Sequence, residues 1–273
     1  MSDAPEAAPS RFAPRPLPGV GRLLDQAVGW APPLRYLLTE ARKAVRKWRW
    51  RRMGATGLRV LDPEALRGKF REALDWVARD GADKVGDYLE LGVFNGTSII
   101  EMNKALSAAN LNHVRMFGFD SFEGMPDSVS EEGSANWEPG MYATTLETVR
   151  RRLNEGGVPE ARSFLIKGFF DKTCTPETVA RYKMGRASVI MIDVEQYTAA
   201  RPALEFAAQF ITDEAVVIMG AWYTPVPYEI GAQRAYGEFM AAHPEFQAAD
   251  FGSYAGFDRQ AGHAYKLTRR AQA

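Results

Sequence analysis

The apolar run at residues 88–93 contains an acid and leads into a glycine-containing turn. Gly92 and Gly96 would let the backbone turn tightly and approach a ligand closely. A helical pattern begins near Thr97, and the first N–H groups of a helix, with its positive dipole end, favour a bound anion such as a carboxylate. Glu90 could supply a negative group for an amine. The same residues would also suit a plain turn between a strand and a helix.

The spacing of this turn does not match that of a dinucleotide site. The dinucleotide fingerprint is G-x-G-x-x-G, whereas the position two after Gly92 is Phe94, whose ring would crowd a pyrophosphate. A cofactor with a carboxylate and no phosphate fits better. A nicotinamide-dependent oxidoreductase therefore has little support.

A second acid, Asp120, follows the apolar run at residues 115–119. An acid at the end of a strand could accept hydrogen bonds from both hydroxyls of a ribose. Taken alone, Asp120 could equally be the N-cap of a helix.

The elements that must position these residues alternate between apolar runs and helical stretches. Strands are predicted at residues 88–93, 115–119, 163–167, 188–192 and 215–219, and helices near 97–109, 146–155, 177–181 and 199–210. A helix at 231–242 precedes two more strands, at 249–254 and 263–268. This alternation predicts a doubly wound, mostly parallel α/β sheet with helices on both faces. Such sheets bind ligands outside the carboxyl ends of their strands.

The N-terminal part of the chain differs from the rest. Residues 1–33 contain seven prolines, which predicts a flexible arm with a short helix at 23–28. Residues 34–84 are predicted to form a helical region, with one helix at 34–53 and another running to residue 79. Asp62 is the expected N-cap of the second helix, and Pro63 lies in its first turn.

The segment Arg35–Arg52 holds eight basic residues and one acid, Glu40. One interpretation is a solvated helix that packs on the domain and is peripheral to the cofactor. The other is a contact with an anionic surface.

Composition narrows the class of protein. The 273 residues carry no net charge, so nothing global calls for nucleic acid as a partner. The single cysteine, Cys174, cannot form an internal disulfide and is interpreted as structural. The chain lacks an apolar run long enough to span a membrane. We therefore expect a cytoplasmic protein, and the sequence leaves a homo-oligomer open.

Four segments together resemble the macrocin O-methyltransferase family, whose members methylate sugar hydroxyls. They are Glu90–Gly96 (E-x-G-x-x-x-G), Asp120–Pro126 (D-S-F-x-G-x-P), Trp137–Tyr142 and Lys167–Thr173 (K-G-x-F-x-x-T). The resemblance covers residues 85–273. It implies a class I methyltransferase domain with a Rossmann-like fold, a C-terminal antiparallel strand and S-adenosylmethionine as cofactor. The residues it implies for cofactor binding are Glu90, Gly92, Asn95, Gly96, Thr97, Asp120, Ser121, Phe122, Gly168 and Phe170.

The sequence departs from this family where a metal would bind. Family members end two strands with D-x-D-x-Y and D-D-W, and acids from both hold a divalent cation, usually magnesium. Here the first motif contains Asp193 and Glu195, and the second has Gly220 and Ala221 in place of both aspartates. Magnesium prefers several oxygen ligands in octahedral geometry. We therefore expect an incomplete metal site, in which Asp193 is the remaining candidate ligand.

Without a metal, the acceptor hydroxyl needs a base to take its proton. Asp193 or Glu195 could be that catalytic base, because burial beside a second carboxylate raises a carboxyl pKa. Alternatively, Asp193 caps the next helix and Glu195 is a solvated surface acid. His263 is kept only as a remote base candidate. The aromatic residues Trp222, Tyr223 and Tyr228 could stack on a sugar or could simply cover the sheet edge.

The sequence thus predicts an S-adenosylmethionine-dependent O-methyltransferase whose small-molecule acceptor is a sugar or a glycosylated metabolite. The alternative is a homologue that binds the cofactor without catalysis and has a structural or regulatory role. The oxygen-free residues Gly220 and Ala221 favour the alternative, and the family-like cofactor segments favour retained binding.

Overall fold

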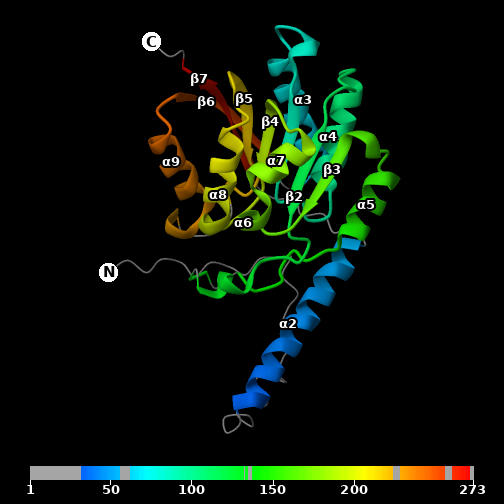
Figure 1. Ribbon diagram of the computed structural model, residues 1–273, viewed down its shortest axis with the longest axis vertical. Helices are drawn as coiled ribbons and strands as arrows, with labels where there is room; N and C mark the ends of the chain where they lie inside the picture. Colours follow the sequence, from blue (N-terminus) through cyan, green and yellow to red (C-terminus); the bar gives the residue numbers. More distant parts are fainter. Residues whose placement is uncertain are drawn as a thin grey trace.

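The computed structural model describes residues 32–55, 62–131, 133–134, 137–223, 228–255 and 260–270. Its centre is one seven-stranded sheet in the order β3-β2-β1-β4-β5-β7-β6 (Figure 1). The first five strands pair in parallel, and β7 runs antiparallel to β5 and β6. The strands are β1 (Asp87–Leu91), β2 (Met116–Asp120), β3 (Ser163–Lys167), β4 (Ala187–Ile192), β5 (Glu214–Met219), β6 (Phe246–Ala255) and β7 (Gln260–Arg269). The predicted fold is confirmed, and the last two strands are longer than predicted.

Helices cover both faces of this sheet and create a core on each. All six residues of β4 are buried, because a central parallel strand is covered on both sides. On one face the core includes side chains of α3 (Pro63–Val77), α4 (Thr97–Ala108) and α5 (Leu146–Glu155). On the other face it includes or contacts side chains of α6 (Phe170–Thr173), α7 (Pro176–Tyr182), α8 (Tyr197–Ala208) and α9 (Ala232–Ala242).

The helix α3 begins as its sequence predicts. Asp62 is its N-cap, and the Asp62 carboxylate accepts hydrogen bonds from the N–H groups of Glu64 at 2.9 Å and Ala65 at 3.2 Å. The apolar face of α3 lies in the same core as α4 and β1. The predicted helix at 23–28 lies outside the described residues.

A long N-terminal helix, α2 (Pro32–Ala55), lies beside the loop that follows β2 and projects away from the domain (Figure 1). Its Trp50 is 1% exposed and belongs to a third apolar cluster. The other buried members of that cluster are all in the loop: Met125, Val129, Trp137, Met141 and Ala143. The end of α2 and this loop therefore form one packed unit.

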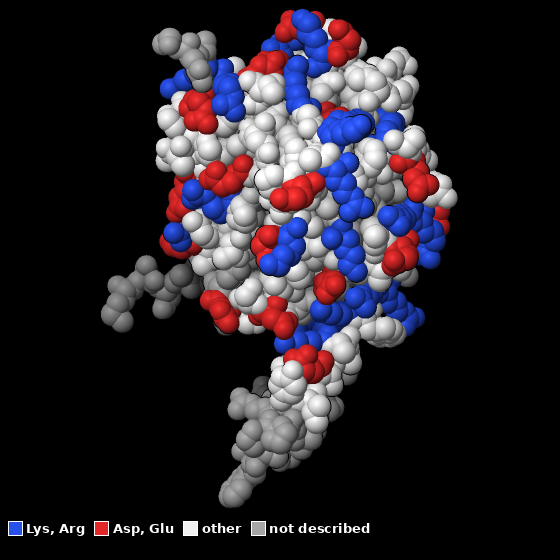
Figure 2. Space-filling view, viewed as in Figure 1, with Lys and Arg blue, Asp and Glu red and all other residues white. Residues whose placement is uncertain are grey.

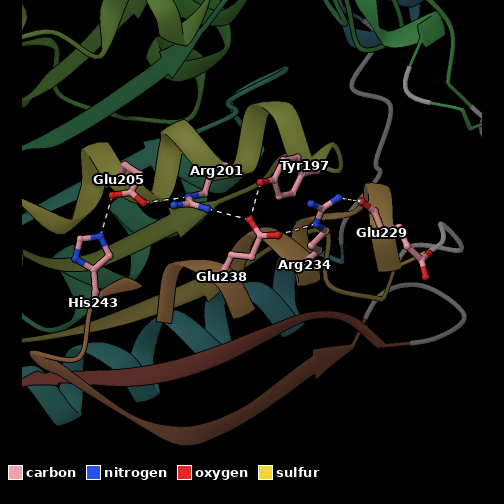
Figure 3. Close-up of polar contacts among 7 residues, drawn as sticks. All are labelled: Tyr197, Arg201, Glu205, Glu229, Arg234, Glu238 and His243. Carbon is pink, nitrogen blue, oxygen red and sulfur yellow. Dashed lines mark hydrogen bonds and ion pairs between the residues drawn. The ribbon is translucent and has the colours of Figure 1, made fainter. Parts of the chain in front are cut away.

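The helices α8 and α9 are joined by a network of charged side chains (Figure 3). The Glu238 carboxylate accepts hydrogen bonds from the Tyr197 hydroxyl at 2.6 Å, from Arg234 at 2.8 Å and from Arg201 at 2.9 Å. Tyr197 is the first residue of α8 and follows Glu195 by two positions. The network thus fixes the start of α8 next to a predicted catalytic residue.

Candidate active site

Two glycines flank an acid at the carboxyl ends of the central strands. The registers of β1, β4 and β5 place Gly92, Asp193 and Gly220 side by side. Gly92 has φ +96°, and a Cβ added to it would lie 2.9 Å from the carbonyl carbon of Asp193. A Cβ added to Gly220 would lie 2.7 Å from Asp193 Cγ. Asp193 therefore fits here because both neighbours lack a side chain.

Asp120 holds the loops after β1 and β2 together. Its Oδ2 accepts hydrogen bonds from the N–H groups of Val93 and Phe94, both at 2.8 Å, and its Oδ1 accepts one from Phe122 at 2.6 Å. Burial raises the pKa of Asp120, while the backbone donors oppose that shift. Asp120 therefore does not cap a helix. Its three hydrogen bonds join the two predicted halves of the cofactor site.

Glu90 is completely buried within β1. Its carboxyl group accepts hydrogen bonds from the Tyr88 hydroxyl at 2.7 Å and from the Ser98 hydroxyl. Burial raises the pKa of Glu90 to about 8, so the carboxyl group mostly keeps its proton at neutral pH. Its predicted role as a negative partner for an amine stays a prediction, and in this structure its partners are two neutral hydroxyls.

The turn before α4 is built by backbone and side chain together. Gly96 is the N-cap of α4 with φ +80°, a left-handed conformation that favours glycine. Asn95 is 2% exposed, and its Oδ1 accepts hydrogen bonds from the Thr97 hydroxyl at 2.8 Å and from the Thr97 N–H at 3.3 Å. Asn95 and Thr97 thus shape the turn, and their contact with a cofactor stays a prediction.

The other predicted cofactor residues lie in two neighbouring loops. Phe122 is 1% exposed in the core, so only its backbone could face a ligand. The Ser121 hydroxyl donates a hydrogen bond to the carbonyl oxygen of Gly124 at 3.1 Å. Gly168 donates its N–H to the carbonyl oxygen of Asp120 at 2.9 Å, which places the start of α6 beside the β2 loop. Phe170 packs against the second core from the first position of α6.

Asp193 is a partly buried acid among other acids. Burial, together with the nearby carboxylates of Glu195 and Asp120, raises the pKa of Asp193 to about 7. Asp193 is not a helix cap, because the N-cap of α8 is Gln196. The alternative interpretation of Asp193 as a cap is therefore wrong. Near neutral pH this carboxyl group exists in both protonation states.

Glu195 is held by two donors from the loop after β2. The Trp137 indole N–H donates to Oε2 at 2.6 Å, and the Tyr142 hydroxyl donates to Oε1 at 3.0 Å. Each oxygen of the carboxylate thus has a fixed partner, and Glu195 is not a solvated surface acid. From sequence, Trp137 and Tyr142 were part of a family-like segment without any assigned role. Their side-chain donor groups could have indicated a polar role, but no periodic pattern in the sequence connects them with Glu195.

Aromatic contacts extend this arrangement to α2. The Trp50 ring lies 4.8 Å from Tyr142 and 6.1 Å from Phe94, measured between ring centroids. Arg46 binds both carboxylate oxygens of Glu138, next to Trp137. The basic segment does pack on the domain, and its last turns contact the loops of the site. Its predicted lack of effect on cofactor binding stays a prediction.

The described residues contain no group of three or more His, Cys, Asp or Glu side chains arranged to hold a metal ion. At the end of β5, Gly220 and Ala221 supply no side-chain oxygen. Asp193 and Glu195 are the two acids that the chain has at the family's metal motif after β4. Whether a cation binds with water and substrate as further ligands stays a prediction.

The sheet edge beyond β5 is aromatic. Trp222 packs against Tyr236 and Tyr265, so it covers the edge of the second core. His263 accepts or donates at Ser253 Oγ, 3.0 Å away, and lies 2.7 Å from Asp250 Oδ1. The side chain of Tyr228 lies outside the described residues. His263 is thus engaged within the β6–β7 hairpin rather than with the acids at the centre of the sheet.

The sequence of the chain matches a known family of methyltransferases. The model of the macrocin-O-methyltransferase family matches residues 41–242. The chain is also 30% identical over 155 residues to the 8-demethyl-8-(2,3-dimethoxy-alpha-L-rhamnosyl)-tetracenomycin-C 4'-O-methyltransferase of Streptomyces olivaceus. That match covers 55% of this chain and 54% of the relative, so the chain matches about half of the relative's length.

Solved structures have a similar fold. The O-methyltransferase NovP matches with a TM-score of 0.57 and 20% identity, covering 76% of this chain and 80% of NovP. An O-methyltransferase from Bacillus cereus in complex with SAH matches with a TM-score of 0.52 and 16% identity, covering 90% of this chain and 97% of that protein. At these identities the likeness establishes the class I methyltransferase fold.

Proposed function

Because the chain belongs to the macrocin O-methyltransferase family, we propose that it transfers a methyl group from S-adenosylmethionine to a hydroxyl of a sugar or glycosylated metabolite. The observation that carries this proposal is the site at the carboxyl ends of β1, β2 and β4. There, the turn that contains Gly92 and the predicted ribose-binding acid Asp120 lie near Asp193 and Glu195. The rhamnosyl substrate in the name of the Streptomyces olivaceus relative supports a sugar acceptor.

The residues present fit the proposed cofactor. Gly92 and Gly96 both have positive φ, a conformation that glycine adopts without strain, and together they make the tight turn before the N-terminus of α4. The free N–H groups of a helix N-terminus favour an anion such as the carboxylate of the cofactor. A carboxylate has about four lone-pair positions, and three N–H groups occupy Asp120. Asp120 could therefore accept from one ribose hydroxyl, rather than both as the sequence suggests. The bound cofactor would supply an electrophilic methyl group on sulfur.

Asp193 is the better base of the two acids. Its raised pKa, about 7, lets it take a proton near neutral pH, and its carboxyl lies at the strand ends over Gly220. Each oxygen of Glu195 already accepts a hydrogen bond from a fixed donor, Trp137 or Tyr142. In this mechanism Asp193 would take the hydroxyl proton as the acceptor oxygen bonds to the methyl carbon and the carbon–sulfur bond breaks, with S-adenosylhomocysteine as the leaving group. Glu195, held by Trp137 and Tyr142, orients the acceptor.

The second candidate function is cofactor binding without catalysis. The absence of side-chain oxygens at Gly220 and Ala221 favours it, because the family's metal ligands at the end of β5 are missing. Under this alternative the chain would bind S-adenosylmethionine and leave acceptors unmethylated.

Methyl transfer from labelled S-adenosylmethionine to a panel of rhamnosides and other glycosides tests the proposal. We expect transfer to at least one acceptor, and we expect Asp193→Asn to lower kcat by about 10²–10⁴-fold. The control is Asp75→Asn, on the exposed side of α3, which should keep full activity. Saturable binding by calorimetry without transfer to any acceptor would favour the alternative. Absence of cofactor binding would refute both.

A further inference from the structure

The helix α2 contacts the domain through only one of its faces. Trp50 is buried, and the ion pairs of this face join Lys43 to Asp127 at 3.0 Å and Arg46 to Glu138 at 2.8 Å. Figure 2 shows basic side chains gathered where α2 meets the domain. Several of the basic residues that the sequence singled out therefore have acidic partners within the chain.

The opposite face of α2 is apolar and exposed. Leu37 is 62% exposed, Val45 57% and Trp48 58%. At 3.6 residues per turn, each lies about 140–160° around the helix from Trp50. Among the described residues, the large exposed hydrophobics are these three together with Tyr36, also on α2, and Phe169. Exposed apolar surface concentrated in this way marks an interaction site.

Two arginines lie next to this apolar face. Arg51 and Arg52 are exposed, and the Arg52 guanidinium lies 5.6 Å from the centre of the Trp48 ring. The one acid in the segment Arg35–Arg52, Glu40, forms an ion pair with Lys43 at 3.0 Å. The outward surface of α2 thus combines apolar side chains with positive charge.

Apolar side chains together with positive charge favour some binding partners of this face of α2 over others. Two copies of α2 paired in parallel through their apolar faces would bring Arg51 and Arg52 near the same arginines of the other copy, and like charges oppose such pairing. An anionic lipid surface would accept both the aromatic and aliphatic side chains and the arginines. Within the described ranges, no helix combines enough length and apolarity to cross a membrane.

We propose that the outward face of α2, formed by Leu37, Val45 and Trp48 with Arg51 and Arg52, binds the surface of an anionic phospholipid bilayer. The helix has 24 residues, a length of about 36 Å at 1.5 Å per residue. It projects from the domain (Figure 1), so it can lie in the plane of the headgroups without losing the contacts of Trp50. This binding is independent of the proposed methyl transfer.

Flotation of the full chain with vesicles tests the proposal. We expect binding to mixed phosphatidylcholine–phosphatidylglycerol vesicles, weak binding to pure phosphatidylcholine, and release by high salt. Arg51→Gln with Arg52→Gln should weaken binding by roughly 25-fold, since each basic residue near an anionic surface contributes about 5-fold. Val45→Ser with Trp48→Ser should weaken binding by about 10-fold or more, because it removes the apolar contact.

The control variant is Phe169→Ser, which removes an exposed aromatic side chain outside α2 and should leave vesicle binding unchanged. Circular dichroism and the thermal midpoint establish that each variant is folded. Absence of vesicle binding, equal binding to neutral and anionic vesicles, or equal losses in the control would overturn the proposal. So would a dimer, seen by sedimentation, that Val45→Ser with Trp48→Ser dissociates while vesicles have no effect.

Discussion

Gly220 is predicted to be required for space rather than for backbone freedom. It is not among the described glycines with positive φ, so alanine meets no conformational strain there. A Cβ at this position would, however, lie 2.7 Å from Asp193 Cγ and 3.0 Å from Asp193 Cβ, and would meet Oδ1 more closely still. Overpacking of this kind costs about 1–3 kcal/mol. We therefore expect Gly220→Ala to lower the free energy of unfolding by that amount.

A double-mutant cycle measured by urea unfolding isolates the cause. If the Asp193 side chain is the obstacle, Gly220→Ala should cost about 0.5–3 kcal/mol less in an Asp193→Ala background than in the wild type. Gly185→Ala is the matched control, because a Cβ there meets nothing within 4 Å. The control should change stability little in either background.

Equal costs of Gly220→Ala in both backgrounds would refute this reasoning, as would a variant as stable as the wild type. The outcome also bears on the metal. Restoring the family's acid by Gly220→Asp would have to displace the Asp193 carboxyl, so a new ligand at 220 would be gained at the expense of the position of Asp193. The missing acid and the present position of Asp193 are thus linked.

Four further outcomes are expected. Asp120→Ala should weaken S-adenosylmethionine binding in calorimetry by about 1–3 kcal/mol, because the ribose of the cofactor loses its hydrogen-bond acceptor; unchanged affinity would contradict this role. The pKa of Glu90, raised from 4.5 to about 8, makes unfolding free energy fall as pH rises through that range, and Glu90→Gln should flatten the fall in a pH series of urea titrations. Magnesium should bind weakly by calorimetry, and methyl transfer should survive a chelator; activity that stops on chelation and returns with magnesium would overturn this expectation. Deleting residues 1–33 should leave cofactor affinity unchanged, and a truncated chain that loses the cofactor would show that the arm matters.

The sheet was predictable because its strands are continuous apolar runs. A strand such as β4 is buried on both faces, so nearly every position must be apolar, and this pattern is visible in the sequence alone. The short helix α6 was not predicted, since four residues are too few to display a helical period. The extra length of β6 was missed because most of its first half is exposed, which leaves no apolar run to detect.

The position of the candidate site was predicted from the rule that ligands bind at the carboxyl ends of parallel strands. That rule brought Asp120, Asp193 and Glu195 together. It could not supply the partners of Glu195, because Trp137 and Tyr142 come from an irregular loop more than 50 positions away. The contact between Tyr88 and Glu90 could have been predicted from the sequence, because residues two positions apart in a strand lie on the same face of the sheet.

The contacts between α2 and the loop after β2 have a consequence for synthesis of the chain. Arg46 and Pro139, which share a hydrogen bond, are 93 positions apart. At about 5–20 residues per second, roughly 5–20 seconds pass between the translation of α2 and that of its loop. The same interval separates their emergence from the ribosome, so for this time α2 is outside with Trp50 as well as Trp48 uncovered. Substitutions in the loop that delay its closure would therefore reduce the yield of folded protein by aggregation of the nascent chain, even where the finished protein is stable.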